Sequence, residues 1–213
     1  MPLAFIKRVS THNQIAVWKV TEAIDWYSLH FKEKKEDINS ILSLKNQSLA
    51  KHRLAARVLL DIVLNKPIFL LKDKCGKPYI NNNPLTLSVS HSKDYVGIAV
   101  NHKLDTGIDI EKIDKKIERI APKFIDKQTL ASEFTTQRIE KLHVYWGAKE
   151  VLFKIYGKGE LNFIENLLVE PFDFKNNGTI TCAIRKGTLN QKYLLNYTVF
   201  NGYMLVYLNN KFE

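Results

Sequence analysis

The order of predicted strands and helices occurs twice along the chain, and this repetition constrains the fold more than any other feature. Runs of β-branched and aromatic residues separated by Gly, Pro and Asn predict strands over 3–9, 14–20, 68–72, 78–80, 85–90, 95–100, 107–111, 166–172, 179–185, 192–200 and 203–209. Apolar residues three and four apart predict helices over 48–64, 115–125 and 137–156, and Thr21 is a candidate cap for a short helix through Leu29. The sequence therefore predicts an α+β protein of two similar halves, 1–103 and 104–213, each with a small antiparallel sheet packed against helices.

The two longest predicted helices have recognisable ends. The hydroxyl of Ser48 is a candidate N-cap for the helix over 48–64, and Pro67 follows its end. Gly157 and Gly159 follow the helix over 137–156 and are typical of a C-terminal stop.

Composition and charge exclude several classes of protein. There is no run of eighteen apolar residues to span a membrane, and residues 1–8 lack the order of a secretion signal, so we expect a cytoplasmic protein. Cys75 and Cys182 have no partner spacing for a zinc site. The net charge is +10, and residues 1–103 carry 16 Lys and Arg against 8 Asp and Glu. Such a positive field attracts phosphates, nucleic acid or an acidic protein.

Two carboxylates stand two apart in the run Gly107-Ile108-Asp109-Ile110-Glu111. On a strand, residues two apart share a face, so Asp109 and Glu111 point the same way. Their mutual repulsion is relieved by a cation, and Mg²⁺ prefers such oxygen ligands. Gly107 leaves room for a ligand to approach. An exposed strand face with ordinary alternation is the alternative interpretation.

A third carboxylate lies in the predicted helix that contains Trp146. In a helix, Trp146, Glu150 and Lys154 fall four apart and line one side. Gly147 inside this helix indicates close packing, since glycine costs about 1 kcal/mol there relative to alanine. The alternative is an exposed pair between Glu150 and Lys154.

Basic and hydroxyl side chains in the first half suggest a phosphate site. Arg53 and Arg57 lie four apart on the helix over 48–64, and Lys77 follows in Gly76-Lys77-Pro78. Ser90 and His91 are adjacent on a predicted strand and so point to opposite faces, which argues against a nucleophile and its base. These residues are equally compatible with phosphate binding or with turn chemistry. A solvated helix face is the alternative for the two arginines.

Taken in order, these segments resemble the motifs of the phosphopantetheinyl transferases of the larger, surfactin-synthetase-activating type. The resemblance spans about residues 50–172 and rests on Arg57, Gly76-Lys77-Pro78, Ser88-Val89-Ser90-His91-Ser92, Gly107-Ile108-Asp109-Ile110-Glu111, Trp146 through Lys154, and Gly157-Lys158-Gly159. It implies a fold of two pseudo-symmetric α+β halves with coenzyme A (CoA) in the cleft between them. The family often has a glutamate where this chain has Gln128, so Gln128 is left out of the site.

The resemblance also implies the roles of individual residues. Asp109, Glu111 and Glu150 would hold Mg²⁺, and Glu150 would also serve as the base. Lys154 would lie beside the leaving group. The remaining implied contacts, with the phosphates and the adenylate end of CoA, involve Arg53, Arg57, Lys77, Ser90 and His91.

The reaction implied is transfer of 4′-phosphopantetheine from CoA to a serine of an acyl or peptidyl carrier protein, releasing adenosine 3′,5′-bisphosphate. Carrier proteins are acidic, which fits a chain of charge +10. We expect no nucleic-acid or membrane partner. We also expect a monomer, because two halves in one chain remove the need for a dimer.

Two other classes fit the residues less well. A metal-dependent nuclease usually places an acid and a lysine two apart on a strand, whereas Leu152 stands two after Glu150. A nucleic-acid-binding module would have aromatic residues among its basic ones. Around Arg53 and Arg57 the neighbours are Leu, Ala and Val, as in a packed helix.

Overall fold

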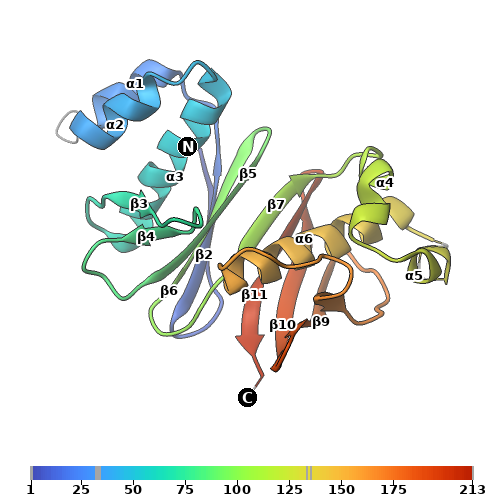
Figure 1. The fold of residues 1–213 in the computed structure, drawn as a ribbon. Coiled ribbons are helices and arrows are strands. Elements are labelled where there is room, and N and C mark those ends of the chain that lie inside the picture. The colour runs from blue at the N-terminus through green and yellow to red at the C-terminus, as the bar shows by residue number, and fades with distance from the viewer. Residues whose placement is uncertain (1, 32–34, 133, 135, 213) are drawn as a thin grey trace. The chain divides into compact units, whose positions relative to one another are not determined.

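The computed structural model describes residues 2–31, 35–132, 134 and 136–212, and the chain divides into two compact units, Met1–Leu104 and Asp105–Glu213. Each unit has its own antiparallel sheet and its own long helix (Figure 1). The prediction of an α+β fold with antiparallel sheets packed against helices is therefore confirmed. No helix in the described ranges is both long and apolar enough to cross a membrane.

The first unit is built around a four-stranded sheet in the order β1-β2-β6-β5. Its elements are β1 (Leu3–Arg8), β2 (Asn13–Lys19), α1 (Ile24–His30), α2 (Lys35–Leu42), α3 (Gln47–Leu64), β3 (Leu70–Lys72), β4 (Pro78–Ile80), β5 (Thr86–Ser92) and β6 (Tyr95–Asn101). Val96, Ile98 and Val100 alternate along β6 and join Leu54 and Val58 of α3 in one core. Burial of this shared apolar surface holds α3 on the sheet.

Helix α3 begins one residue earlier than the sequence suggested, and its cap differs. The side chain of Asn46 accepts a hydrogen bond from the backbone N–H of Leu49 at 3.0 Å. Ser48 therefore lies inside the helix, and its prediction as the N-cap was wrong. Both residue types cap well, and the loop before α3 brings Asn46 into the capping position. The helix ends at Asn65, whose φ of 50° is left-handed.

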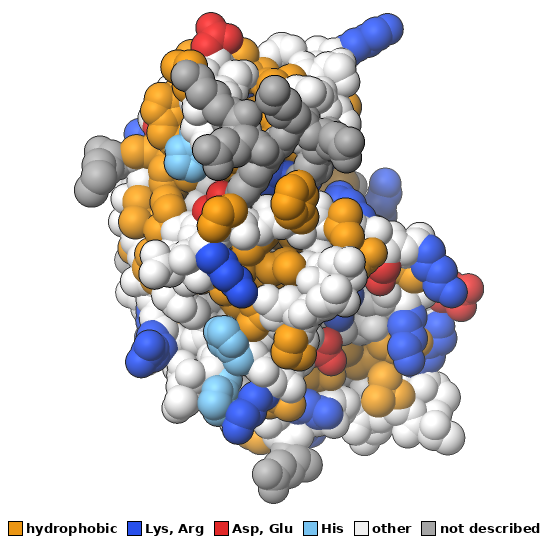
Figure 2. All heavy atoms as spheres, turned by 90° about the vertical axis from the view of Figure 1, so that its left-hand side faces the viewer, with side chains coloured by type: hydrophobic (Ala, Val, Ile, Leu, Met, Phe, Trp, Pro, Cys, Tyr) orange, Lys and Arg blue, Asp and Glu red, His pale blue; other side chains and the backbone are white. Residues whose placement is uncertain are grey.

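The surface of the first unit is mixed. Strands β3 and β4 form a hairpin in which Leu71 is opposite Tyr79, and these two side chains and Phe69 are exposed. Lys72 and Lys74 are exposed in the same hairpin. Figure 2 shows such a mixture, with Lys and Arg side chains interspersed among apolar ones over one face.

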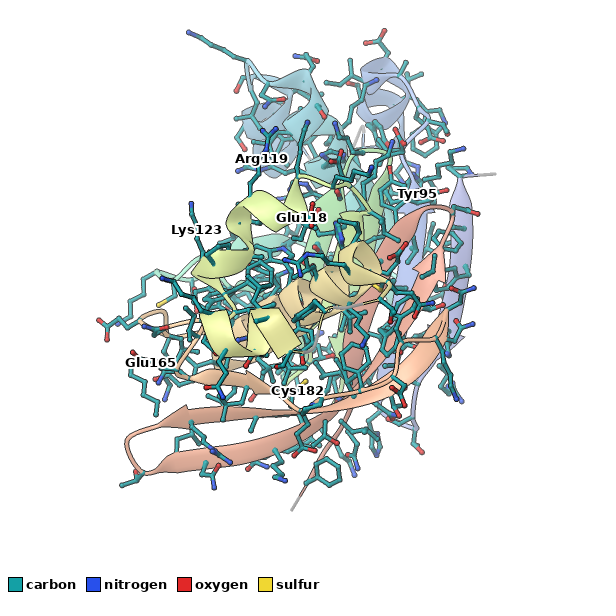
Figure 3. All side chains as sticks on the ribbon, turned by 90° about the vertical axis from the view of Figure 1, so that its right-hand side faces the viewer. Tyr95, Glu118, Arg119, Lys123, Glu165 and Cys182 are labelled. Carbon is teal, nitrogen blue, oxygen red and sulfur yellow. The ribbon has the colours of Figure 1, made fainter. Side chains whose placement is uncertain are left out.

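The second unit has a five-stranded sheet in the order β7-β11-β10-β9-β8. Its elements are β7 (Ile108–Lys112), α4 (Ile117–Ile120), the 3₁₀ helix η1 (Ala121–Lys123), α5 (Lys127–Ser132), α6 (Arg138–Tyr156), β8 (Leu167–Val169), β9 (Asn177–Lys186), β10 (Leu189–Phe200) and β11 (Tyr203–Lys211). Ala148 and Leu152 of α6 pack with Leu195, Val206 and the buried Cys182 of the sheet. Figure 3 labels Cys182 in this sheet, and Glu118, Arg119 and Lys123 on the α4–η1 segment.

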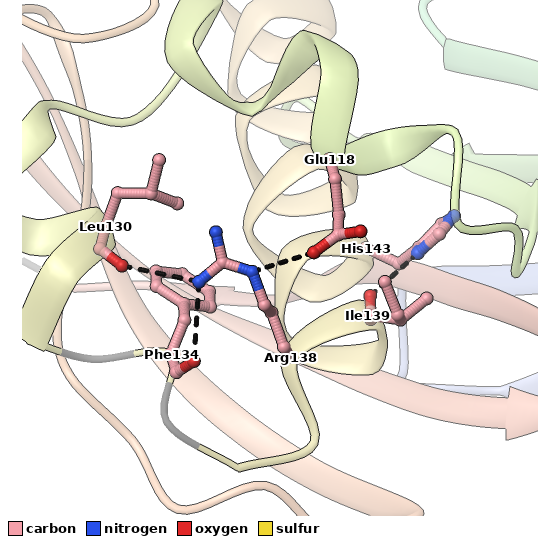
Figure 4. Close-up of polar contacts among 6 residues, drawn as sticks. All are labelled: Glu118, Leu130, Phe134, Arg138, Ile139 and His143. Atoms are coloured by element: carbon pink, nitrogen blue, oxygen red, sulfur yellow. Dashed lines mark hydrogen bonds and ion pairs between the residues drawn. The ribbon is translucent and has the colours of Figure 1, made fainter.

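Polar contacts fix both ends of α6. At its start, Arg138 Nε lies 2.9 Å from Glu118 Oε1, and Nη1 donates to the carbonyl groups of Leu130 and Phe134 (Figure 4). These bonds join α6 to α4 and α5. At its end, Gly157 has a φ of 65° and donates its N–H to Phe153 O, as expected of a C-terminal glycine. The predicted stop at Gly157 is confirmed.

Candidate functional site

The carboxylates of β7 occupy different environments. Asp109 is 3 % exposed, whereas Glu111 is half-buried. They pair with Val206 and Met204 of β11, two residues apart in register, and so share a face of the sheet. For Asp109 the alternative of an exposed strand face is wrong. A buried carboxylate needs a nearby positive charge or hydrogen bonds.

Lys154 of α6 supplies a positive charge to Asp109. Its Nζ lies 2.8 Å from Asp109 Oδ1 and donates a second hydrogen bond, of 3.0 Å, to the backbone oxygen of Ile108. The ion pair joins the middle of β7 to the last turn of α6, 45 residues apart in sequence. The strand and the long helix thus place an acid and a base side by side.

Glu150 lies one helical turn before Lys154 and is electrostatically coupled to the same pair. Burial raises the pKa of Glu150, the charge of Asp109 raises it further, and the charge of Lys154 opposes both effects. The three side chains Asp109, Glu150 and Lys154 therefore form an acidic pair with one ammonium group, hereafter the acidic cluster. A carboxylate with a raised pKa is a better proton acceptor than an ordinary glutamate.

Two glycines allow α6 to approach the sheet closely. A Cβ at Gly147 would lie 2.7 Å from Val206 Cγ2 and 3.5 Å from Asp109 Oδ2. The close packing predicted at Gly147 is confirmed, and it brings α6 up to Asp109. A Cβ at Gly107 would lie 2.9 Å from both Cγ1 and the backbone oxygen of Val151. The neighbour of Gly107 is therefore α6, where a ligand was expected.

The two carboxylates of the acidic cluster are suitable ligands for a hard divalent cation, whereas its ammonium group is not. Carboxylate oxygens are the ligands that Mg²⁺ prefers, and one or two of them suffice when a substrate phosphate and water complete the octahedron. Across residues 2–31, 35–132, 134 and 136–212, no three His, Cys, Asp or Glu side chains lie close enough together to hold a metal ion. Asp109 and Glu150 are the two acids whose charges interact.

The basic residues predicted for phosphate binding surround a pocket in the first unit. The pocket has a volume of about 490 Å³ and is lined by Leu49, His52, Arg53, Ala56 and Arg57 of α3, Ser40 and Ile41 of α2, Leu70, Leu71, Lys72, Gly76 and Pro78 of the β3–β4 hairpin, and Val89 and His91 of β5. Three predicted residues, Arg53, Arg57 and His91, thus come together. The pocket combines an apolar wall with several cationic groups, which suits a nucleotide-like ligand.

The other two predicted residues lie next to this lining. Ser90 is buried on β5, beside His91 and opposite Gly97. Lys77 lies between Gly76 and Pro78, and its backbone N–H donates to Asp73 Oδ1 at 2.8 Å in the hairpin turn. The turn uses the left-handed φ of 83° at Gly76, which glycine adopts readily.

Arg57 also has a structural role in the pocket wall. Its side chain is buried, and its guanidinium donates to the backbone oxygens of Arg53 at 3.1 Å and of Leu70 at 3.3 Å. These bonds join α3 to β3. The alternative of a solvated helix face is therefore wrong for Arg57.

Sequence reasoning did not assign His52 to the site. Its ring stacks on that of His91, with the centroids 4.5 Å apart and the planes at 15°. A signal for it existed, because Leu49, His52, Arg53, Ala56 and Arg57 form one helical stripe of i, i+3, i+4, i+7 and i+8. Extending the predicted pair of arginines along that stripe would have included His52.

Aromatic side chains surround Trp146 on the second unit. Its ring lies 5.2 Å from that of Phe124 and 5.6 Å from that of Phe163. A pocket of about 480 Å³ is lined by Trp146, Phe163, Ile120, Lys123 and Asn162. The lining is mostly apolar, with Lys123 as its cationic member.

In a comparison with protein families, residues 105–205 match the model of the 4′-phosphopantetheinyl transferase superfamily. The matched segment lies within the second unit and includes the acidic cluster. No curated protein matches the chain. Members of this superfamily are transferases that use CoA as substrate and act on carrier proteins. The match supports placing the chain in the 4′-phosphopantetheinyl transferase superfamily.

Proposed function

We propose that the protein transfers the 4′-phosphopantetheine moiety of CoA to a serine hydroxyl of an acyl or peptidyl carrier protein, in a Mg²⁺-dependent reaction that releases adenosine 3′,5′-bisphosphate. Within the superfamily, its motifs are those of the surfactin-synthetase-activating type. The observation that carries the proposal is the acidic cluster, in which Asp109, Glu150 and Lys154 meet inside the segment that matches the superfamily.

The two sites suit different parts of CoA. The pocket of the first unit offers Arg53, Arg57 and His91, which fit the phosphorylated adenylate end. Lys77 and Ser90, beside that lining, complete the proposed set. The acidic cluster offers carboxylates that can bind a cation, and it also contains the ammonium group of Lys154. A cation and an ammonium group together suit the negative charges of a diphosphate.

Proton transfer is assigned to Glu150. The serine oxygen of the carrier forms a new bond to the β-phosphorus of CoA, and the bond from that phosphorus to the bridging oxygen breaks. The serine proton passes to Glu150, whose raised pKa makes it a better proton acceptor than an ordinary glutamate. The leaving group departs as adenosine 3′,5′-bisphosphate.

Lys154 and the metal ion are proposed to offset negative charge on the phosphates of CoA. The ammonium of Lys154, 2.8 Å from Asp109, would lie near the leaving phosphate and offset its developing negative charge. When bound, Mg²⁺ would be held by Asp109 and Glu150 and would neutralise charge on the diphosphate oxygens. Glu111, the third predicted ligand, does not form a group of three with them among the described residues. The chain itself then supplies the base, the ammonium and the positioning of the substrates.

The test is a mass measurement on an unmodified acyl carrier protein mixed with CoA, Mg²⁺ and the purified protein. We expect the carrier to gain the mass of one phosphopantetheine and a chelator to abolish the gain. Glu150→Gln should reduce the rate at least about a hundredfold, the usual cost of losing a general base. Asp109→Asn removes a proposed ligand of the cation and should also reduce the rate. Glu170→Gln, in an exposed ion pair with Lys192, is the matched control and should keep the wild-type rate. No mass gain on any of several acyl and peptidyl carriers would refute the proposal.

The carrier is expected to be recognised by charge. The chain has a net charge of +10, and an acidic partner is attracted to it over about one Debye length. Raising the NaCl concentration from 50 to about 500 mM should therefore increase the KM for the carrier more than the KM for CoA. Equal increases in the two KM values would count against charge-guided docking.

A further inference from the structure

His52 has two contacts that bear on its neighbour His91. It lies in the first half of α3, is 7 % exposed and lines the pocket of the first unit. His91 reaches the same pocket from β5. The two rings stack at 4.5 Å with nearly parallel planes, so the face of His91 is covered by an imidazole from another element.

The second contact fixes the turn that follows His91. His52 Nε2 lies 2.7 Å from the backbone oxygen of Lys93. A carbonyl oxygen only accepts, so Nε2 carries the proton of this bond. Lys93 belongs to the tight turn between β5 and β6, where Ser92 pairs with Tyr95, and it has a left-handed φ of 51°. A non-glycine residue with such a φ is uncommon and needs support from its surroundings.

We infer that His52 is a positioning residue that holds His91 in the orientation in which it binds a phosphate group of the ligand. Stacking limits the tilt of the His91 ring, and the bond to Lys93 fixes the backbone two residues later. Because Nε2 is used in that bond, this atom of His52 is not the one offered to the ligand. The inference rests on the proposed function in one respect, namely that the pocket takes the 3′-phosphorylated adenylate end of CoA.

A purely structural role for His52 would have a different signature. If His52 only stabilised the unit, its loss would weaken all ligands of the pocket alike. If it acts through His91, its loss should lower the affinity for ligands that carry the phosphate bound by His91. The affinity for ligands that lack this phosphate should not change. The effect should also vanish once His91 is absent, because the two residues then form one functional unit.

The experiment is calorimetric titration of the full chain with adenosine 3′,5′-bisphosphate and, separately, with adenosine 5′-monophosphate, which lacks the 3′-phosphate. We expect His52→Ala to increase the Kd for the bisphosphate about tenfold and the Kd for the monophosphate less than about twofold. A loss of about tenfold is the usual cost of one hydrogen bond to a charged group. His91→Ala should produce a similar loss. The double variant should bind no more weakly than His91→Ala alone.

Two further variants separate the contacts. His52→Phe retains an aromatic ring but lacks the donor, and it should recover part of the affinity that His52→Ala loses. The control is His30→Ala, which removes another stacked histidine, at 5.2 Å from the Trp26 ring, in an exposed position outside the pocket. It should bind both ligands as wild type does. Circular dichroism at the titration temperature establishes that each variant is folded.

The outcomes are distinguishable. Equal weakening of both ligands by His52→Ala, additive losses in the double variant, or unchanged binding would each overturn the positioning role while leaving the proposed function in place. Failure of the wild-type protein to bind adenosine 3′,5′-bisphosphate at all would overturn both this inference and the assignment of the pocket to CoA.

Discussion

Lys154 Nζ lies 2.8 Å from Asp109 Oδ1, in an ion pair whose carboxylate is buried and whose lysine side chain is 23 % exposed. Removing one partner of such a pair leaves a buried charge without compensation, which is far costlier than losing an exposed pair. Asp109 is also repelled by Glu150, because their charges interact. The pair therefore contributes to the stability of the second unit as well as to its proposed chemistry.

The first prediction concerns this pair. Lys154→Met should lower the free energy of unfolding by about 3 kcal/mol, the lower end of the range for a broken buried pair, because Lys154 retains some contact with water. Asp109→Asn in the same chain should recover part of the loss, since the carboxylate left without its partner is then removed as well. Urea unfolding measures both. Lys192→Met, in an exposed pair with Glu170, should cost less than about 1 kcal/mol, and a loss equal to that of Lys154→Met would contradict the argument.

The second prediction concerns the pKa of Glu150, measured by NMR titration of its carboxyl carbon in metal-free protein. In the wild type it should lie above 4.5, because burial and Asp109 both disfavour the charged form. Asp109→Asn removes a negative charge and should lower this pKa. Lys154→Gln removes a positive charge and should raise it. An unchanged pKa in both variants would show that burial alone controls the pKa of Glu150.

Local patterns in the sequence were sufficient for most elements of the fold. The apolar run of β6, all of whose residues are buried, and the apolar residues spaced along α6 reflect burial in the two cores. The positive φ of Gly157 gives α6 a clear end. Helices α2 and α5 were not predicted. Helix α5 is short and has no buried residue, whereas α2 has apolar residues at Ile38, Ile41 and Leu42 that follow a charged run and are too few to stand out in the sequence. The N-cap of α3 was misplaced because Asn46 and Ser48 have similar capping preferences.

The candidate site was less accessible to such reasoning. The spacing of Asp109 and Glu111 predicted a shared face, but no local pattern relates β7 to a helix 45 residues away. Lys154 was expected to contact a phosphate, and its ion pair with Asp109 was not anticipated. That contact depends on how closely α6 packs on the sheet, and this distance is controlled by Gly147 and Val206.

The third prediction tests this packing. Gly147→Ala places a methyl group 2.7 Å from Val206 Cγ2, so the helix or the valine must move. Overpacking of this kind costs about 1–3 kcal/mol, and the better helix propensity of alanine offsets about 1 kcal/mol of it. Thermal or urea unfolding should show a net loss. Val206→Ala removes the nearest methyl group, so the loss in the double variant should be smaller than the sum of the two single losses.

Gly107→Ala provides a comparison for the double variant of Gly147 and Val206. Its new methyl group would lie 2.9 Å from the backbone oxygen of Val151, which no side-chain truncation removes. Val151→Ala should therefore rescue Gly107→Ala less well than Val206→Ala rescues Gly147→Ala. Equal rescue in the two cycles would mean that α6 moves freely on the sheet, contrary to the packing described above.

The fourth prediction concerns Lys149, which precedes Glu150 on α6. It is 5 % exposed and donates a hydrogen bond of 2.6 Å to the backbone oxygen of Phe163. Burial lowers its pKa from 10.5 to about 8. Between these two values the unfolded chain retains the lysine proton while the folded protein releases it, so the free energy of unfolding should rise as the pH increases through this window.

Lys149→Met isolates this contribution, because a thioether of similar length has no proton to release. Urea unfolding at pH 7.5, 8.5 and 9.5 should show the wild type gaining stability relative to Lys149→Met as the pH rises. The exposed variant Lys192→Met should follow the wild-type curve with a constant offset. Parallel curves for the wild type and Lys149→Met would show that the folded protein keeps the proton. The hydrogen bond to Phe163 would then be donated by a buried ammonium.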